Sequence, residues 1–174
     1  ISVLCDGPLL AGLRVRRQIN QSLLTQEITL QRGSRRVDFR TQVQWQERHK
    51  LLKVAFDLDL RASEALHEIQ FGHLARPNHA SRPGDADRFE VPAQRFTALR
   101  EEGRGAAVLN DGKYGVSVLD GTIALSLLRA PLAPDMRADL GLQEFTYALY
   151  SWNGGLLDSA LVQEAAALNT PPLL

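Results

Sequence analysis

The chain contains one cysteine, Cys5, among its 174 residues. A single thiol excludes an internal disulfide framework and a metal site made of several thiolates, and it favours a reducing, cytoplasmic location. Long apolar runs are also absent, because no segment approaches the roughly 20 apolar residues that a membrane-spanning helix requires. We therefore expect no membrane among the partners of this chain.

The chain also lacks an excess of charge of one sign, because 20 Lys or Arg are balanced by 20 Asp or Glu. Without a net positive field, the electrostatic footprint of a nucleic-acid-binding protein is missing. The balance is uneven along the chain, with ten basic and four acidic residues in positions 1–53. We interpret this asymmetry as paired surfaces within a larger assembly, because the basic residues are spaced singly along expected strands.

The chain begins with Ile1 rather than methionine, and its first residues already fit a strand. A hydrophobic content of 44% over this length suffices for one core of domain size and is short for two. We therefore expect a single domain over residues 1–174, excised from a longer chain.

Alternation of apolar and polar residues with a period of two is the clearest pattern in the sequence. One expected strand has the apolar-side residues Val37, Phe39, Thr41, Val43 and Trp45, with polar residues between them. Similar but less regular alternation occurs in 13–19, 24–30, 52–60 and 69–71. From His73 to Glu90 the alternation stops, which predicts a long irregular loop.

Turn and helix signals complete the expected fold. Asn110 to Gly112 and Asp120 with Gly121 favour tight hairpins, and Pro131 ends a strand. A helix is expected from about Asp158 to Leu168, with Leu161, Ala165 and Leu168 on one face and Asp158 or Ser159 as the N-cap. About eight to ten strands with one short C-terminal helix predict an all-β, antiparallel β-sandwich.

Several groups of side chains are candidates for chemistry, and each has a simpler structural explanation. His73, His79, Asp85 and Asp87 are residue types that bind zinc, but their spacing matches no compact metal motif, so a solvated loop is favoured. The carboxylate pairs Asp85 with Asp87 and Glu101 with Glu102 are residue types that glycosidases use, and here too the solvated interpretation is favoured.

No nucleophile or phosphate site is expected either. Cys5 has no histidine close in sequence and is expected to be a small buried hydrophobe, and Gly103 to Gly105 is too short to cradle a phosphate. Aromatic residues on alternating strand positions are expected to be core rather than a stacking surface for sugars or bases. These aromatic residues are Trp45, Tyr114, Tyr147, Tyr150 and Trp152. The residues by themselves therefore predict no catalytic residue and no metal ligand in this chain.

Several motifs resemble, in one order and nearly from end to end, the C-terminal β region of zinc-dependent α-mannosidases of glycoside hydrolase family 38, particularly the bacterial and cytosolic type. The matching runs are GSRRVDF (33–39), WQERHKLLKVAF (45–56), EIQFG (68–72), RP (76–77), RFEVP (88–92), LNDGKYG (109–115), LSLLRAP (125–131), the loop with Asp135 and Asp139, and FTYALY (145–150). The resemblance implies a part of a larger β-sandwich region behind a catalytic domain.

The resemblance also implies a division of labour. Such enzymes cleave terminal α-mannosides with retention, using a carboxylate nucleophile, a carboxylic acid as proton donor, and a zinc ion that grips the sugar hydroxyls. Those residues belong to N-terminal catalytic and helical domains, and none maps onto this chain. We therefore expect the segment alone to be inactive and without a cofactor, with zinc and the catalytic groups supplied by the missing domains of the same polypeptide.

One direct role is implied for a loop of this region, since loops here reach the active-site mouth in some relatives. The positions that match are Arg129, Asp135 and Arg137, expected to bind substrate. The simpler alternative is that Arg129 pairs with a carboxylate to fix a strand end.

Two further possibilities of different class remain open at this point. A free-standing carbohydrate-binding module would present two or three exposed aromatic residues on one face. A purely structural segment, which we favour, would bury its basic strand faces against missing neighbours or form a homo-oligomer, and would meet the mannoside only indirectly.

Overall fold

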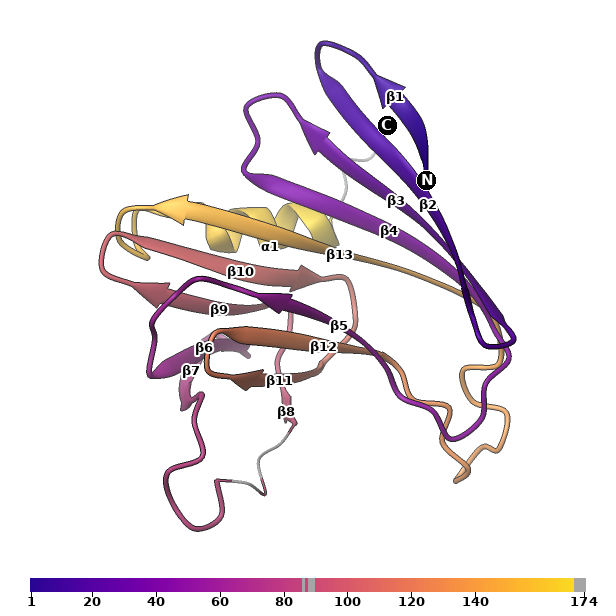
Figure 1. Ribbon diagram of the computed structural model, residues 1–174. Helices are drawn as coiled ribbons and strands as arrows, with labels where there is room; N and C mark the ends of the chain where they lie inside the picture. Colours follow the sequence, from indigo (N-terminus) through magenta and orange to yellow (C-terminus); the bar gives the residue numbers. More distant parts are fainter. Residues whose placement is uncertain (86, 88–89, 171–174) are drawn as a thin grey trace. The chain divides into compact units, whose positions relative to one another are not determined.

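The computed structural model describes residues 1–85, 87 and 90–170. The chain divides into two compact units (Figure 1), which are described separately. The first comprises Ile1–Leu52 and Leu127–Ala148, and the second comprises Lys53–Ser126 and Leu149–Leu174. The expectation of one domain over 1–174 stays a prediction. No helix in the described part of the chain is long and apolar enough to cross a membrane.

The first unit is an antiparallel sheet in the strand order β1-β2-β3-β4-β13. Its strands are β1 (Ser2–Asp6), β2 (Leu10–Ile19), β3 (Ser22–Gln31), β4 (Arg36–Trp45) and the first part of β13 (Gly141–Asn153). The central row of the register joins Leu13, Ile28 and Phe39 on one face. The period-two prediction for β4 is confirmed, because Thr41, Val43 and Trp45 are buried and Gln42 and Gln44 are exposed.

The second unit contains two antiparallel sheets. In the first sheet, the end of β13 is followed by β10, β9, β6 and β7. In the second sheet, the strand order is β5-β12-β11-β8. The strands are β5 (Leu52–Asp57), β6 (Glu64–Ile69), β7 (Gly72–Pro77), β8 (Val91–Pro92), β9 (Phe96–Glu101), β10 (Arg104–Asn110), β11 (Gly115–Leu119) and β12 (Thr122–Leu128). Leu99, Leu109, Val116 and Ile123 are fully buried core residues. The predicted all-β, antiparallel fold is therefore confirmed.

The hairpin turns follow the predicted chemistry. Asn110 ends β10, and its side-chain Oδ1 accepts hydrogen bonds from the backbone N–H groups of Gly112 (3.0 Å) and Lys113 (2.7 Å). Asp120 adopts a positive φ of 50° between β11 and β12. Gly121 follows it because a Cβ there would lie 2.5 Å from the carbonyl oxygen of Leu58. β5 ends at Asp57, just before Leu58 lies against Gly121, so the expected strand over 52–60 was too long.

The predicted loop at 73–90 was wrong at its start. Residues 72–77 form β7, which pairs with β6, and Phe71 lies in the turn between them with a φ of 65°. β7 is an edge strand whose residues are exposed on both faces. Buried and exposed residues therefore do not alternate along it, and the sequence shows no alternation of apolar and polar residues there. With such short or exposed strands, the described residues form thirteen strands rather than eight to ten. Arg88 and Phe89 of the resemblance lie outside the described residues.

The C-terminal helix α1 (Leu161–Asn169) is confirmed, with Leu161 and Ala165 buried. Its predicted cap was wrong: the N-cap is Ala160 and no side chain caps it. Asp158 instead accepts a hydrogen bond from the N–H of Gly155, and Ser159 donates its hydroxyl to the carbonyl of Leu156. Competing local turns therefore use both candidate caps. Pro171 and Pro172 lie outside the described residues.

Candidate functional site

The three predicted substrate-binding residues lie together in the first unit, in residues 129–140 between β12 and β13, which we name the 129–140 loop. Arg129 follows the last residue of β12 directly. Arg129, Asp135 and Arg137 are all exposed. Within the described residues, the guanidinium groups of Arg129 and Arg137 form no ion pair, so their donors are free for another partner.

Asp139 closes the base of the 129–140 loop. Its Oδ2 accepts hydrogen bonds from the backbone N–H groups of Arg129 and Ala130, both at 2.8 Å. Ala130 and Asp139 have positive φ values of 44° and 66°, which non-glycine residues adopt only where surrounding contacts hold them. The alternative that Arg129 pairs with a carboxylate to fix this strand end stays a prediction; the contact that the structure shows is between the backbone N–H of Arg129 and Asp139.

A second local turn positions Arg137. The Oδ1 of Asp135 accepts the backbone N–H of Arg137 at 2.9 Å. The N–H of Ala138 donates to the carbonyl of Asp135 (3.3 Å), and the N–H of Leu140 donates to that of Arg137 (3.1 Å). The peptide bond between Ala133 and Pro134 is cis. Asp135 therefore holds the turn that carries Arg137. Both residues are exposed to solvent.

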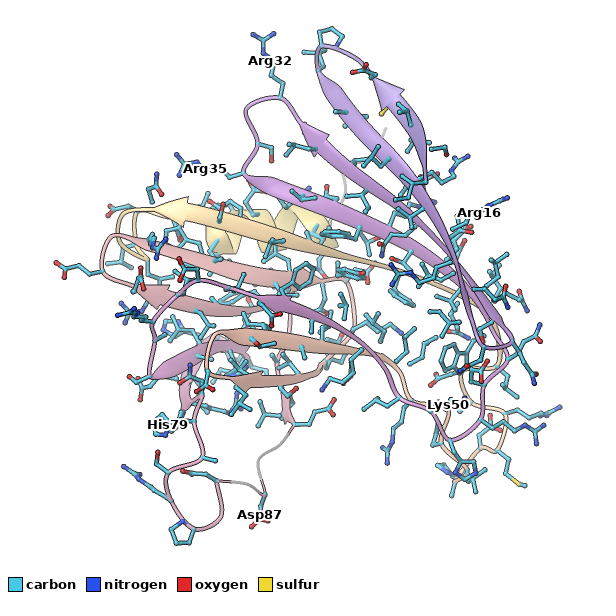
Figure 2. All side chains as sticks on the ribbon, in the orientation of Figure 1. Arg16, Arg32, Arg35, Lys50, His79 and Asp87 are labelled. Carbon is cyan, nitrogen blue, oxygen red and sulfur yellow. The ribbon has the colours of Figure 1, made fainter. Side chains whose placement is uncertain are left out.

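The loop between β4 and β5 lies against the 129–140 loop, because the N–H of His49 donates to the carbonyl of Ala130 at 3.2 Å. Arg48, His49 and Lys50 are exposed there, and Figure 2 shows Lys50 at this end of the sheet. In the sequence, residues 47–50 are only a short polar segment between two expected strands. The fold thus adds basic residues from a second loop to Arg129 and Arg137.

Glu47 anchors that second loop. Its buried carboxylate accepts the backbone N–H of Gln21 (2.8 Å) and the hydroxyl of Ser22 (3.1 Å), and Lys50 Nζ lies 3.2 Å away. The hydrogen bond from Gln21 and the charge of Lys50 hold the pKa of Glu47 below its usual value, although burial opposes them. An ionised Glu47 accepts hydrogen bonds and does not donate a proton at neutral pH.

The side chains considered for zinc do not come together. His73 lies on β7, whereas His79 contacts the hydroxyl of Ser81 through Nδ1 at 2.8 Å. The Oδ2 of Asp85 accepts the backbone N–H groups of Ser81 and Arg82. His79 and Asp87 are on the same long loop, where Figure 2 labels them. Across residues 1–85, 87 and 90–170, no three His, Cys, Asp or Glu side chains form a group suited to a metal ion.

Glu101 is the centre of an ion-pair network in the second unit. It accepts the backbone N–H of Arg61 at 2.7 Å and pairs with Arg104, which also donates to the carbonyl of Asp59 (2.8 Å). The hydrogen bond from Arg61 and then the contact with Arg104 lower the pKa of Glu101. A carboxylate held ionised in this way stabilises loops and does not suit a proton donor.

His67 is a buried titratable group that the sequence did not single out. It is 2% exposed on β6, and its Nδ1 lies 3.2 Å from the hydroxyl of Thr97. Burial, with a smaller contribution from the charge of Arg76, lowers its pKa to about 4. His67 is therefore neutral at physiological pH and belongs to the core.

The aromatic residues divide unevenly between core and surface. Trp45, Tyr147, Tyr150 and Trp152 are buried, as predicted, but Tyr114 is 59% exposed and that part of the prediction was wrong. Tyr114 lines a cavity of about 410 Å³ in the second unit. The other lining residues are Glu68, Ile69, Gln70, Pro92, Ala93 and Gln94. The carboxylate of Glu68 already has a partner, because it accepts hydrogen bonds from the backbone N–H and from the guanidinium of Arg95.

The chain is similar to parts of known α-mannosidases. A family model described as "Glycosyl hydrolases family 38 C-terminal domain" matches residues 1–137. Alpha-mannosidase 2C1 of Homo sapiens is 51% identical over 152 residues, which is 87% of this chain and 15% of that protein. Alpha-mannosidase G of Dictyostelium discoideum is 47% identical over 84% of this chain and 13% of that protein.

A solved structure has the same fold over almost the whole chain. The crystal structure of an alpha-mannosidase from Enterococcus faecalis V583 aligns with a TM-score of 0.84 and 18% identity, covering 95% of this chain and 23% of that chain. The present chain thus spans about 15% of the length of the curated relatives it matches first, and under a quarter of this solved chain.

Proposed function

Because the chain belongs to the glycosyl hydrolases family 38 C-terminal domain family, we propose that it is a structural β-domain of an alpha-mannosidase that hydrolyses terminal alpha-mannosides. The observation that carries the proposal is the extent of the match: proteins named alpha-mannosidase are about half identical over most of this chain and are several times longer. The partners of the domain are then the catalytic and helical domains of the same polypeptide.

The chemistry of bond cleavage is assigned to the rest of that polypeptide. A retaining glycosidase needs a carboxylate nucleophile and a second carboxylic acid with a raised pKa. In the segment, Glu47 and Glu101 have lowered pKa values and hold loops in place. Zinc, which would grip the sugar hydroxyls, also belongs outside, because the described His and Asp residues do not fit a metal site.

The segment's own contribution to substrate binding is assigned to Arg129 and Arg137, with Asp135 as the residue that positions Arg137. A guanidinium presents several N–H donors in a fixed plane, which suits hydrogen bonding to sugar hydroxyls. Asp139 holds the base of the 129–140 loop and Asp135 holds its tip, so both arginines are presented from an ordered backbone. The mannoside would be contacted only at this loop.

Activity assays test the proposal directly. We expect the 174-residue chain alone, with zinc added, to leave an aryl alpha-mannoside uncleaved, and the full-length polypeptide that contains it to cleave the same compound. Turnover by the 174-residue chain that is lost in Asp135→Asn would contradict the assignment of catalysis to other domains. Absence of turnover by the full-length polypeptide would contradict the mannosidase proposal itself.

The cellular setting that we propose is the cytoplasm, in mannose metabolism. The lone thiol Cys5 fits a reducing compartment, and a relative about half identical over most of the chain is alpha-mannosidase 2C1. Expression of the full-length polypeptide with a fluorescent tag tests this location, and accumulation in a membrane-bound compartment would contradict it.

A carbohydrate-binding role is a second candidate function, favoured by the cavity beside Tyr114. The exposed phenol ring, together with the amides of Gln70 and Gln94, offers a stacking surface and hydrogen-bonding groups of the kind that sugars need. Isothermal titration calorimetry of the chain with mannose oligomers tests this role. Heat of binding that is lost in Tyr114→Ala would support it, and absence of heat would reject it.

A further inference from the structure

We infer that the outer apolar face of β1, β2 and β3 is the surface on which another apolar layer of the same longer polypeptide packs. This inference rests on the proposed function, because it names which face of the domain meets the remaining chain. We define the face by the apolar side chains that the register places on one side of these strands, namely Val3, Ala11, Leu13, Val15, Leu24, Ile28 and Leu30; the same side also carries Asp6, Arg17 and Gln26.

The two sides of this sheet differ in chemistry. The side of the outer apolar face carries Leu13 opposite Ile28, and the opposite side carries Arg14 opposite Glu27, joined by an ion pair of 2.7 Å. Arg36 and Asp38 pair on that opposite side as well. The charged side therefore carries internal ion pairs and suits contact with water, which leaves the apolar side as the one that needs a covering layer.

Burial along the face changes from strand to strand. At β4 and β13 the same side is closed, because Thr41, Val43, Phe145 and Tyr147 are buried. At the outer strands it is open: Val3 is 67% exposed, Leu13 44% and Leu30 43%. A groove of about 330 Å³ runs over this open part, lined by residues that include Ala11, Leu13 and Leu30. Exposed apolar side chains grouped on one side of a sheet are typical of an interaction surface.

The closed part of the face is held together by hydrogen bonds and ring stacking beside the open part. Gln26 donates to the hydroxyls of Thr41 (2.9 Å) and Tyr147 (2.6 Å), and the rings of Phe39 and Tyr147 stack with centroids 5.1 Å apart.

The occupant to which we commit is an apolar sheet or helix face from the part of the polypeptide outside this segment. The family relatives extend far beyond the matched region, so enough chain exists to supply such a layer. Apolar chemistry follows from the lining, which is mostly aliphatic although Asp6 also contributes to it, because a charged partner would lose its hydration against Leu13, Ile28 and Leu30.

Leu23 provides a matched control for the test. It is a leucine on β3 with 43% exposure, against 44% for Leu13, but the register places it opposite Gln18 and Gln44 on the charged side. Exposure alone therefore predicts equal reactivity for the two leucines, whereas docking predicts protection of Leu13 only.

The experiment is hydroxyl-radical footprinting of the full-length polypeptide that contains this segment, read by mass spectrometry at single residues. We expect Leu13 and Leu30 to be oxidised several-fold more slowly than Leu23. Equal oxidation of Leu13 and Leu23 would overturn the inference, and so would protection of Leu13 in the 174-residue chain alone at a concentration where that chain is monomeric.

Substitution gives a second readout. Leu13→Asp in the full-length polypeptide should lower its Tm by more than about 4 °C relative to Leu23→Asp, since a charge is placed in a dry interface. Equal Tm values would overturn the inference. Mannosidase activity measured on the same wild-type preparation reports separately on the proposed function, because footprinting does not depend on turnover.

Discussion

At the scale of single residues, Arg129 and Arg137 are distinguished by guanidinium groups that have no carboxylate partner in the described chain, while their backbones are fixed by Asp139 and Asp135. Some other arginines are engaged in ion pairs: Arg14 pairs with Glu27, and Arg104 pairs with Glu101. Side chains held ready but unpaired are what a substrate contact requires.

The first prediction concerns these two arginines. In the full-length polypeptide we expect Arg129→Ala and Arg137→Ala each to raise the KM for an aryl alpha-mannoside about tenfold, corresponding to one hydrogen bond to a charged group. Arg32→Ala is the control, since Arg32 is an exposed arginine of the same unit at the opposite end of its sheet (Figure 2). Steady-state kinetics checks this, and equal KM values for all three variants would contradict it.

The second prediction concerns the titration of His67. Because burial depresses its folded pKa to about 4, protonation favours the unfolded chain, and the stability contribution is complete above the unfolded pKa of about 6.5 and lost as the pH falls toward 4. We expect the free energy of unfolding to drop by about 2 kcal/mol between pH 6.5 and 4.5.

Urea unfolding at both pH values measures this drop. His67→Gln should remove most of the pH dependence, whereas His79→Gln should leave it, because His79 is exposed. A wild-type unfolding free energy that stays constant over this range would refute the burial argument.

At the scale of elements, the strand β10 packs closely against Trp152 of β13 at Gly105. A Cβ at Gly105 would lie 2.1 Å from Cζ2 of Trp152, inside the second unit and against a buried ring. Gly72, at the start of β7, has nothing within 4 Å of the same position. Packing therefore requires the absence of a side chain at Gly105, whereas a side chain has room at Gly72.

The third prediction follows from this pair. Gly105→Ala should destabilise the chain by about 3 kcal/mol, because the indole must leave its packed position. Gly72→Ala should change the free energy of unfolding by less than about 0.5 kcal/mol. Chemical denaturation of the two variants compares them, and similar unfolding midpoints would show that Trp152 adjusts freely.

At the scale of the whole molecule, the outer apolar face determines how the isolated chain behaves. Exposed apolar surface that normally meets another layer drives association when that layer is missing. Val3, Leu13 and Leu30 leave such a surface on one side of the first unit.

The fourth prediction is that the isolated 174-residue chain self-associates as its concentration rises, and that Leu13→Asp with Leu30→Asp reduces this association. Leu23→Asp should leave it unchanged, because that residue lies on the charged side. Sedimentation velocity over a concentration series measures the effect. A strictly monomeric wild-type chain would contradict the prediction.

Much of the fold was predictable because its signals are local. Alternation in β4 follows from one buried face, and the turn at Asn110 follows from a side chain that bonds its own backbone. β7 was missed because a strand exposed on both faces has no such alternation, and the cap of α1 was misplaced because Asp158 and Ser159 bond within a preceding turn.

The sequence by itself determined the antiparallel β class, the terminal helix and the family, since each depends on residue order and short-range chemistry. Tertiary structure alone decided that the loop with His49 and Lys50 joins the 129–140 loop, that Asp139 closes the latter, and which sheet face stays open. These features depend on contacts between residues far apart in the chain, and such contacts leave no periodic pattern in the sequence.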